Sequence, residues 1–533
     1  MLANFVLENK MFKFMPLFFK NRSVVTVSLL CVPLLFIMLA INIRALHGPL
    51  YQANFSDPSY AYLLNSLNIT NGESPGHIDH PGTTVQLLGG GVLYLSVLIG
   101  KITGDNTSIT DKVLTDPERY ITQITNVLVS ILTIAIFLFG LQIYRETKHL
   151  WISIIAQMFP LTSSTLLEYL PRLQPEPLLV ACAFLLAAVL VPFVTGTVDR
   201  SSSGTKPFLA GVIIAFGVVT KVTFIPLCVF LLVFCSKKQN VIALVAFVCT
   251  LFILTIPIWD SISQVYSWLV DVMTHSGRYG SGEVGLPELS KLFKNGIHLF
   301  KTNPVIFYFI PILLVSLFIR KRSKKYSAVN RFILFSLLVL ITSILITVKH
   351  YAPHYIVPTI AFSGFFVFIS IFYFSWKKIN FLIFFVFIIG SLLLFKYNKQ
   401  TESKLLRHKI IHSDYSWLQE RSQKHDCRLV SYYRSSLPEY ALLFGNDFSR
   451  RVYGEKLMAI YPENLSYNIW EKKFYNFRGG LSEPDVNNLH KQSNPVCLLG
   501  TGKLPYQGEP NVELLEKKGK LVLYKFLGFN KKK

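Results

Sequence analysis

The sequence predicts a polytopic α-helical membrane protein that ends in a small C-terminal α/β domain. Of its 533 residues, 51% are hydrophobic and only 16% are charged, and a soluble domain of this composition would expose large apolar patches. Long apolar runs recur from residue 24 onward, and most approach the roughly 20 residues that cross a bilayer as a helix. From about residue 396 the chain is more polar. We therefore predict a membrane domain over residues 1–395 and an α/β domain over residues 396–533.

The net charge of +23 is compatible with binding either to nucleic acid or to anionic lipid. The lysines and arginines form short clusters between apolar runs and in the C-terminal part of the chain. This distribution is typical of topology signals and of contact with anionic lipid. The sequence therefore predicts membrane lipids as partners and no nucleic acid.

The first apolar run, residues 24–43, follows a basic N-terminal segment. It is longer than the apolar region of a signal peptide and lacks a small-residue cleavage site, which predicts an uncleaved span with the N-terminus inside. The loop 44–120 is then outside. Within it, residues 83–99 are apolar but broken by three consecutive glycines. The segment could span the membrane, but the glycines favour a helix lying in or near the interface.

Ten further spans bring the predicted total to about eleven. The basic connections between them then fall on the cytoplasmic side, as the positive-inside rule requires. An odd number of spans places the C-terminal domain outside the cytoplasm. The ten spans are 121–143, 150–167, 177–195, 207–221, 222–235, 241–258, 304–319, 332–348, 356–374 and 380–395.

Residues 207–235 allow two interpretations, one long tilted helix or two short limbs that turn at Thr220 and Lys221. We favour two limbs. A single span would move the basic cluster 320–325 to the outer side and leave Lys221 in the middle of the bilayer, where a charge is costly.

The C-terminal domain alternates strand-like runs with polar helical segments, as a small α/β domain does. The strand-like runs include 427–433, 496–500 and 521–524. Cys427 and Cys497 each lie in such a run. In an oxidising compartment they can form a disulfide, and two buried free thiols are the alternative.

The outer loop 44–120 is the first place where the sequence suggests chemistry. Asp57 follows closely after the first span, and a carboxylate there can accept the proton of an attacking hydroxyl or amine. The alternative is a turn, because Ser-Asp-Pro is an ordinary turn sequence. Asp79, between His77 and His80, is a second candidate for the base or for orienting an acceptor. This cluster could bind a divalent ion, but no zinc-type Cys/His spacing is present, and no metal ligand is assigned.

Charged residues also recur at the predicted outer edge of the membrane. Arg172 and Glu176 lie between two spans, Lys221 lies at the turn described above, and residues 349–355 follow a later span. Basic groups that converge from separate helices would suit a lipid phosphate or pyrophosphate. Snorkelling of each side chain to the interface is the alternative.

The outer loop 260–303 contains a glycine-rich segment, residues 275–285. His275, Arg278 and Tyr279 lie among its glycines. This composition predicts a mobile lid that becomes ordered when substrate binds. A surface loop without a role is the alternative.

Taken in order, these motifs resemble the GT-C superfamily, in particular the family of dolichyl-phosphate-mannose protein mannosyltransferases and bacterial aminoarabinose transferases. The resemblance covers residues 24–375 and implies a GT-C-like membrane domain. It departs from the family in having Pro58 where a second acid is usual and Gly82 where a proline is usual, and both departures leave the acceptor open. The matching motifs are Asp57-Pro58, His80-Pro81-Gly82, residues 171–176, Thr220-Lys221 and residues 349–358.

The resemblance implies an inverting glycosyltransferase that uses a sugar linked to polyprenyl phosphate. Asp57 would be the base, His80 would support the loop or the sugar, and the acceptor would be a glycan, lipid or protein on the outer face. A bacterial cytoplasmic membrane is favoured, with the endoplasmic reticulum as the alternative. The predicted substrate-binding and donor-binding residues are Asp79, His80, Arg172, Glu176, Lys221, His275, Arg278, Tyr279, Lys349, His354 and Tyr355.

A transporter or flippase of lipid-linked sugars is the alternative function. The many spans and the charges at the membrane edge are compatible with it. Transporters, however, usually contain paired repeats and helices broken deep in the membrane, whereas this chain has a large outer loop and a polar C-terminal domain.

Overall fold

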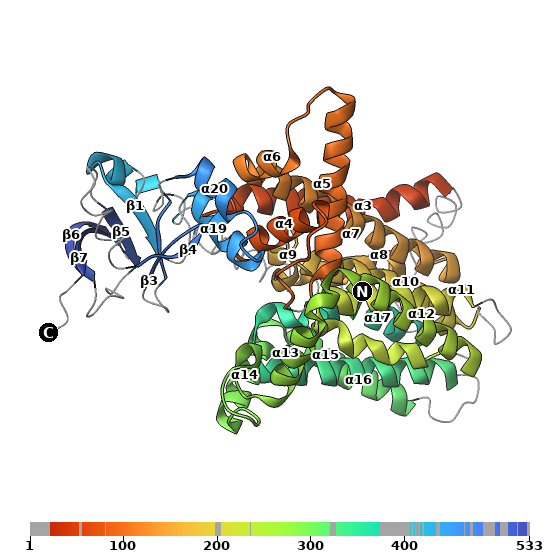
Figure 1. Cartoon of the computed structure of the whole chain (residues 1–533). Coiled ribbons are helices and arrows are strands. Elements are labelled where there is room, and N and C mark those ends of the chain that lie inside the picture. The colour runs from red at the N-terminus through yellow and green to blue at the C-terminus, as the bar shows by residue number, and fades with distance from the viewer. Residues whose placement is uncertain are drawn as a thin grey trace, which may run out of the picture.

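The structure is a computed structural model. It describes residues 22–52, 56–79, 81–197, 204–234, 236–319, 327–373, 420–432, 437–462, 464–468, 473–482, 496–501, 510–519 and 521–529, with residues 406, 410, 413, 416 and 417. The helices of the membrane domain form one body, and the strands lie together at the opposite end of the molecule (Figure 1).

Among the described residues, seven helical segments are long and apolar enough to cross a membrane, or eight with a bent pair counted as one span. The chain is therefore a multi-pass membrane protein. Three of the eleven predicted spans are shorter apolar helices, 150–162, 205–220 and 222–232, and the predicted span 380–395 lies outside the described residues. The seven long segments are Ser23–His47, Thr83–Ile102, Pro117–Thr147, Glu176–Thr195, Lys237–Thr274, Val329–Lys349 and Pro353–Phe372.

The first part of the membrane domain contains the outer loop and its helices. Here α3 packs against α7 and α8, and α4 packs against α5 and α7. The elements are α3 (Arg22–His47), α4 (Ser56–Thr70), α5 (Thr83–Ile102), α6 (Ile109–Thr115), α7 (Pro117–Thr147), α8 (Leu150–Met158), η1 (Phe159–Thr162) and α9 (Ser164–Tyr169).

Helix α5 has the length and hydropathy of a membrane span, so the spanning alternative fits it as well as the interfacial helix that its glycines suggested. Its glycines allow close packing against α4. A β-carbon on Gly89 would lie 2.2 Å from the Ser66 hydroxyl, and one on Gly90 would lie 3.0 Å from Ile69. The glycine run therefore marks a helix contact and not a break.

The second part of the membrane domain surrounds α10, which is buried along most of its length and packs against α7, α11 and α17. Its first residue, Glu176, is thereby fixed at one end of the helix bundle. The elements here are α10 (Glu176–Thr195), α11 (Thr205–Thr220), η2 (Val222–Leu232), α12 (Lys237–Thr255), η3 (Ile256–Ser261), α13 (Ile262–Thr274), η4 (Arg278–Gly280), α14 (Leu289–Thr302), α15 (Pro304–Ile319), α16 (Ser327–Lys349), η6 (Pro353–Ile356) and α17 (Val357–Tyr373).

The segment 207–235 contains two elements, as in the two-limb interpretation. Helix α11 ends at Thr220, Lys221 is extended (φ −166°, ψ 135°), and the 3-10 helix η2 follows. Further on, α14 and α15 meet at a bend of 91°. The predicted span 304–319 corresponds to α15.

The C-terminal domain contains a seven-stranded mixed sheet in the order β4-β3-β2-β1-β5-β7-β6, with β1 parallel to both β2 and β5. Two helices accompany it, so the predicted α/β character is confirmed. Its elements are β1 (Arg428–Tyr432), α19 (Pro438–Phe448), α20 (Gly454–Ile460), β2 (Ser466–Asn468), β3 (Lys473–Asn476), β4 (Gly479–Gly480), β5 (Val496–Thr501), β6 (Pro510–Lys518) and β7 (Leu521–Phe529).

A disulfide stabilises this domain, and one of its helices holds it against the membrane helices. Cys427 and Cys497 form a disulfide, which resolves the choice between a pair and two free thiols. Helices α19 and α20 lie between the sheet and the membrane helices (Figure 1), and α19 packs on α4. The C-terminal domain therefore rests on the outer loop that holds Asp57.

Candidate functional site

Asp57 lies at the start of α4, with a non-helical backbone (φ −91°, ψ 123°) and an exposed side chain. Arg172, in the turn before α10, is buried, and its Nη2 donates a hydrogen bond to the Asp57 carbonyl oxygen at 3.2 Å. Two motifs that are 115 residues apart in the sequence thus meet at the outer loop. Burial lowers the pKa of the Arg172 guanidinium, and the nearby Tyr169, Glu168 and Asp57 oppose that effect.

Glu176 and Lys221 form a buried ion pair, with 2.7 Å between Glu176 Oε1 and Lys221 Nζ. Their side chains are only 3% and 5% exposed. Glu176 begins α10 and Lys221 lies between α11 and η2. A buried charge is tolerated when a hydrogen-bonded partner of opposite sign compensates it. The partner of Glu176 is therefore Lys221.

Two aromatic residues of the motif at 349–358, His354 and Tyr355, lie at the same site. The Lys221 ammonium group lies 5.5 Å from the centre of the Tyr355 ring, which is a cation–π distance. The His354 ring contacts Tyr355 at 4.7 Å and Tyr169 at 5.3 Å between ring centres. Burial raises the pKa of the Tyr169 hydroxyl, and the carboxylates of Glu168 and Glu176 raise it further.

His77 is buried in the segment that leads to α5, with its ring between those of Tyr62 and Phe448, at 5.1 Å and 5.2 Å between ring centres. Burial lowers its pKa and Lys221 lowers it further, while the carboxylates of Asp79 and Asp57 raise it. Burial is the largest effect, so His77 is neutral near pH 7. Asp79 is half-buried.

His80 lies outside the described residues, so its predicted role stays a prediction. Within the part of the chain that the structure describes, no three His, Cys, Asp or Glu side chains are arranged to hold a metal ion.

Gly82, where the resembled family has proline, is required by the local geometry. Its φ is +74°, which proline cannot adopt because its ring fixes φ near −65°. A β-carbon there would lie 2.6 Å from the Tyr62 hydroxyl oxygen. The Gly82 amide donates to Val219 O at 3.1 Å, and the Thr84 and Thr220 hydroxyls are 2.6 Å apart. These contacts hold the start of α5 beside the Glu176–Lys221 pair.

Lys349 has a different environment from Arg172 and Lys221. Its Nζ donates to Val272 O at 3.0 Å and to Met273 O at 2.5 Å. His350 Nε2 also lies 2.9 Å from Val272 O. These side chains cap the C-terminal carbonyls of α13, as basic groups commonly do at helix ends. Lys349 therefore contacts the end of α13, and its predicted role in donor binding stays a prediction.

The glycine-rich segment 275–285 has internal hydrogen bonds. Ser276 N donates to Glu283 O at 3.0 Å and Gly277 N donates to Ser281 O at 2.7 Å. His275 Nδ1 lies 3.2 Å from Asp271 O. Tyr279 is 50% exposed with φ +57°, and the Arg278 side chain is outside the description. These residues form a structured turn between α13 and α14, and the predicted lid motion stays a prediction.

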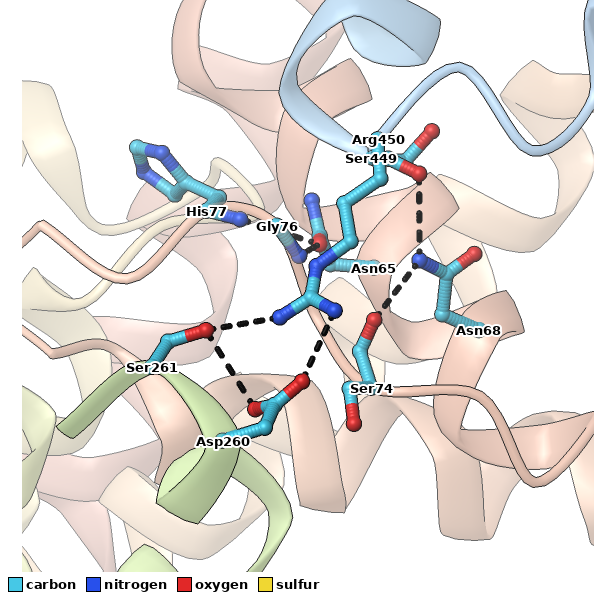
Figure 2. A network of polar contacts seen from close by, with 9 residues as sticks. All are labelled: Asn65, Asn68, Ser74, Gly76, His77, Asp260, Ser261, Ser449 and Arg450. Carbon is cyan, nitrogen blue, oxygen red and sulfur yellow. Dashed lines mark hydrogen bonds and ion pairs between the residues drawn. The ribbon is translucent and has the colours of Figure 1, made fainter. Parts of the chain in front are cut away.

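The C-terminal domain contacts the outer loop through a network of polar groups (Figure 2). Asn65 Oδ1 accepts the Gly76 and His77 amides at 2.6 and 3.1 Å, and Asn65 Nδ2 donates to Phe448 O at 3.1 Å. Arg450 of the same domain lies beside these groups. It donates to Asp260 Oδ2 at 2.8 Å and to Ser261 Oγ at 2.7 Å.

Two residues that the sequence analysis did not single out belong to the site. Tyr62 is fully buried, and within the described residues its hydroxyl has no hydrogen-bond partner. Burial raises its pKa well above the usual value, and Glu176, Asp79 and Asp57 act in the same direction. Tyr169 joins the site through His354. No sequence signal distinguished either tyrosine from the other aromatic residues.

The comparisons with known proteins establish the fold. No family model and no curated protein matches the chain. The solved structure of ArnT from Cupriavidus metallidurans in the apo state matches with a TM-score of 0.50 and 11% identity, over 92% of this chain and 97% of that one. The same protein bound to undecaprenyl phosphate matches with a TM-score of 0.42 over the same shares of the two chains. The match to the apo structure confirms the predicted resemblance at the level of the fold, which is ArnT-like.

Proposed function

We propose that this protein is a glycosyltransferase that moves a sugar from a polyprenyl-phosphate-linked donor to an acceptor at the outer face of a membrane. One observation carries the proposal. Arg172 contacts Asp57, Glu176 pairs with Lys221, and Lys221 contacts Tyr355, so motifs from four separate segments meet at one site. The ArnT-like fold supports the same class of activity.

Asp57 is the proposed general base. Its side chain is exposed, where an acceptor can reach it, and Arg172 holds its backbone from the buried side. As the acceptor oxygen or nitrogen attacks the sugar C1, Asp57 takes its proton. The bond between C1 and the phosphate oxygen breaks, the oxygen leaves with the electron pair, and the configuration at C1 is inverted.

The basic side of the site stabilises the departing lipid phosphate in this proposal. The buried Arg172 guanidinium, which donates to the Asp57 carbonyl oxygen, brings a fixed positive charge to the phosphate. Lys221 is paired with Glu176. In this proposal it positions Glu176 and Tyr355 and also contributes positive charge to the site. Donors fixed before the reaction stabilise developing negative charge best.

We further propose that the C-terminal domain faces the outer side and that the membrane is a bacterial cytoplasmic membrane. The disulfide between Cys427 and Cys497 supports an oxidising compartment for this domain. The packing of α19 on α4 keeps the domain on the side of the Asp57 loop.

The test is Asp57→Asn in membranes supplied with a polyprenyl-phosphate sugar. Removing a general base lowers the rate by about 10²- to 10⁴-fold, so we expect transfer measured by radiolabelled sugar to fall by that factor. Asp105→Asn is the matched control. It changes an acid of the same outer loop, exposed and paired with Lys112 at 2.6 Å, and it should retain wild-type transfer.

Wild-type transfer by correctly inserted Asp57→Asn protein would refute the assignment. Movement of a lipid-linked sugar across proteoliposomes without any transfer would instead favour the transporter or flippase. Transfer and transport can both be measured on the same proteoliposomes, so the two functions can be distinguished in one experiment.

A further inference from the structure

Helix α14 (Leu289–Thr302) presents a bare apolar face. Leu289, Phe293 and Ile297 are 69%, 65% and 55% exposed. They recur every four residues and therefore lie on one side of the helix. Water is a poor environment for a contiguous apolar stripe of this kind. We therefore expect this face of α14 to be in contact with lipid or with another apolar surface.

The opposite side of α14 is basic. Lys291, Lys294, His298 and Lys301 are all exposed and are spaced by three and four residues, which places them in one row. A basic row opposite an apolar stripe is the pattern of a helix that lies in the plane of a membrane interface.

A third edge of α14 fastens the helix to the membrane domain. Leu299 is fully buried, and Asn295 Nδ2 donates to Val348 O at 2.8 Å. The His298 ring lies 4.7 Å from the Tyr351 ring. The helix is thus held in one orientation, with its apolar face turned away from the protein.

The apolar face opens into a groove of about 460 Å³ where α15 turns away from α14 at 91°. Its lining is entirely apolar or glycine: Leu289, Leu292, Phe293, Gly296, Ile297, Phe300 and Phe307. A hydrocarbon chain fits such a lining, and a polar ligand would lose its hydrogen bonds there.

We propose that α14 lies in the membrane interface and that an anionic phospholipid occupies this surface, with an acyl chain in the groove and its phosphate at the lysine row. The four basic positions complement an anionic headgroup. The proposal requires only the membrane fold and is independent of the proposed transfer reaction.

The test uses the full chain reconstituted in nanodiscs of phosphatidylcholine with phosphatidylglycerol, followed by native mass spectrometry of the lipids that remain bound. We expect the wild type to retain phosphatidylglycerol in preference to phosphatidylcholine. The variant K291Q/K294Q/K301Q should lose that preference. The control K456Q/K473Q/K517Q removes the same charge from exposed lysines of the C-terminal domain and should keep it.

A second variant, Phe293→Ser with Ile297→Ser, tests the groove. It should reduce retention of both phospholipids, with no change in Tm, because both side chains are exposed. Equal lipid preference in the wild type and in the lysine variant would overturn the proposal. So would displacement of phosphatidylglycerol by equimolar polyprenyl phosphate, which would assign the groove to the donor. A wild-type dimer that the serine variant separates would assign it to a second copy.

Discussion

Lys221 and Glu176 show how two buried charges are retained at the site. Each is at most 5% exposed, and each is the partner of the other. Attraction inside a protein compensates desolvation only when geometry is good and both members are present. Because one residue follows α11 and the other begins α10, the pair also fixes how these helices meet beside Asp57.

Lys221→Met should therefore destabilise the protein strongly, by about 3–5 kcal/mol, since it leaves Glu176 buried and unpaired. The double variant Lys221→Met with Glu176→Leu should lose less than Lys221→Met alone. The measurement is thermal unfolding in detergent micelles. Lys456→Met, which removes an exposed pair with Asp111, is the control and should leave Tm nearly unchanged. A double variant as unstable as the single one would contradict this account.

At the scale of elements, the segment between α4 and α5 is fastened at several points. Asn65 binds the amides of Gly76 and His77, and Gln86 Nε2 donates to His77 O at 2.6 Å. The His77 ring packs between Tyr62 of α4 and Phe448 of α19. This histidine therefore links both helices to the loop that carries Asp79.

Because burial lowers the pKa of His77 below its usual value, the folded protein binds fewer protons there than the unfolded chain does. Stability should consequently fall as pH drops below about 6.5, the unfolded pKa, and the loss is complete at the folded pKa. Tm measured at about pH 7.5 and about pH 5.5 tests this. His77→Phe, which keeps an aromatic ring, should reduce the difference. Part of the difference in Tm should remain in this variant, because burial also lowers the pKa of His350.

At the scale of the whole molecule, Arg450 connects parts of the chain that are far apart in sequence. It belongs to the C-terminal domain, binds Asp260 and Ser261 at the α12–α13 junction, and lies against Gly76 of the outer loop (Figure 2). A β-carbon on Gly76 would lie 2.8 Å from Arg450 N. The outer loop is thus held between the C-terminal domain and the membrane helices.

Arg450→Ala should release this contact at a cost of about 1 kcal/mol, because the ion pair is partly exposed but has a second partner. Hydrogen exchange of the amides in segment 71–79 should accelerate. Arg451→Ala is the matched control, since Arg451 has nearly the same backbone (φ 57° against 60°) and pairs with Asp447 of α19. Equal acceleration in both variants would indicate a general loss of packing instead.

The sequence by itself determined the membrane class, the position of most apolar helices and the order of the motifs, because hydropathy is a local property of the chain. It also placed the break at Lys221, since a charge in mid-bilayer is costly. It did not determine how many of the apolar helices are long enough to span a membrane. The same hydropathy argument predicted an apolar helix at 83–99 but did not explain its glycines, which allow packing against α4, a contact that no local pattern reveals.

Only the tertiary structure decided which charges meet. Glu176 pairs with Lys221, and Lys349 caps α13. These pairings depend on where helices that are distant in sequence come together. The same holds for Gly82, whose difference from the resembled family was visible in the sequence. The physical reason, a positive φ beneath the Tyr62 hydroxyl, exists only once α4, α5 and α11 are packed together.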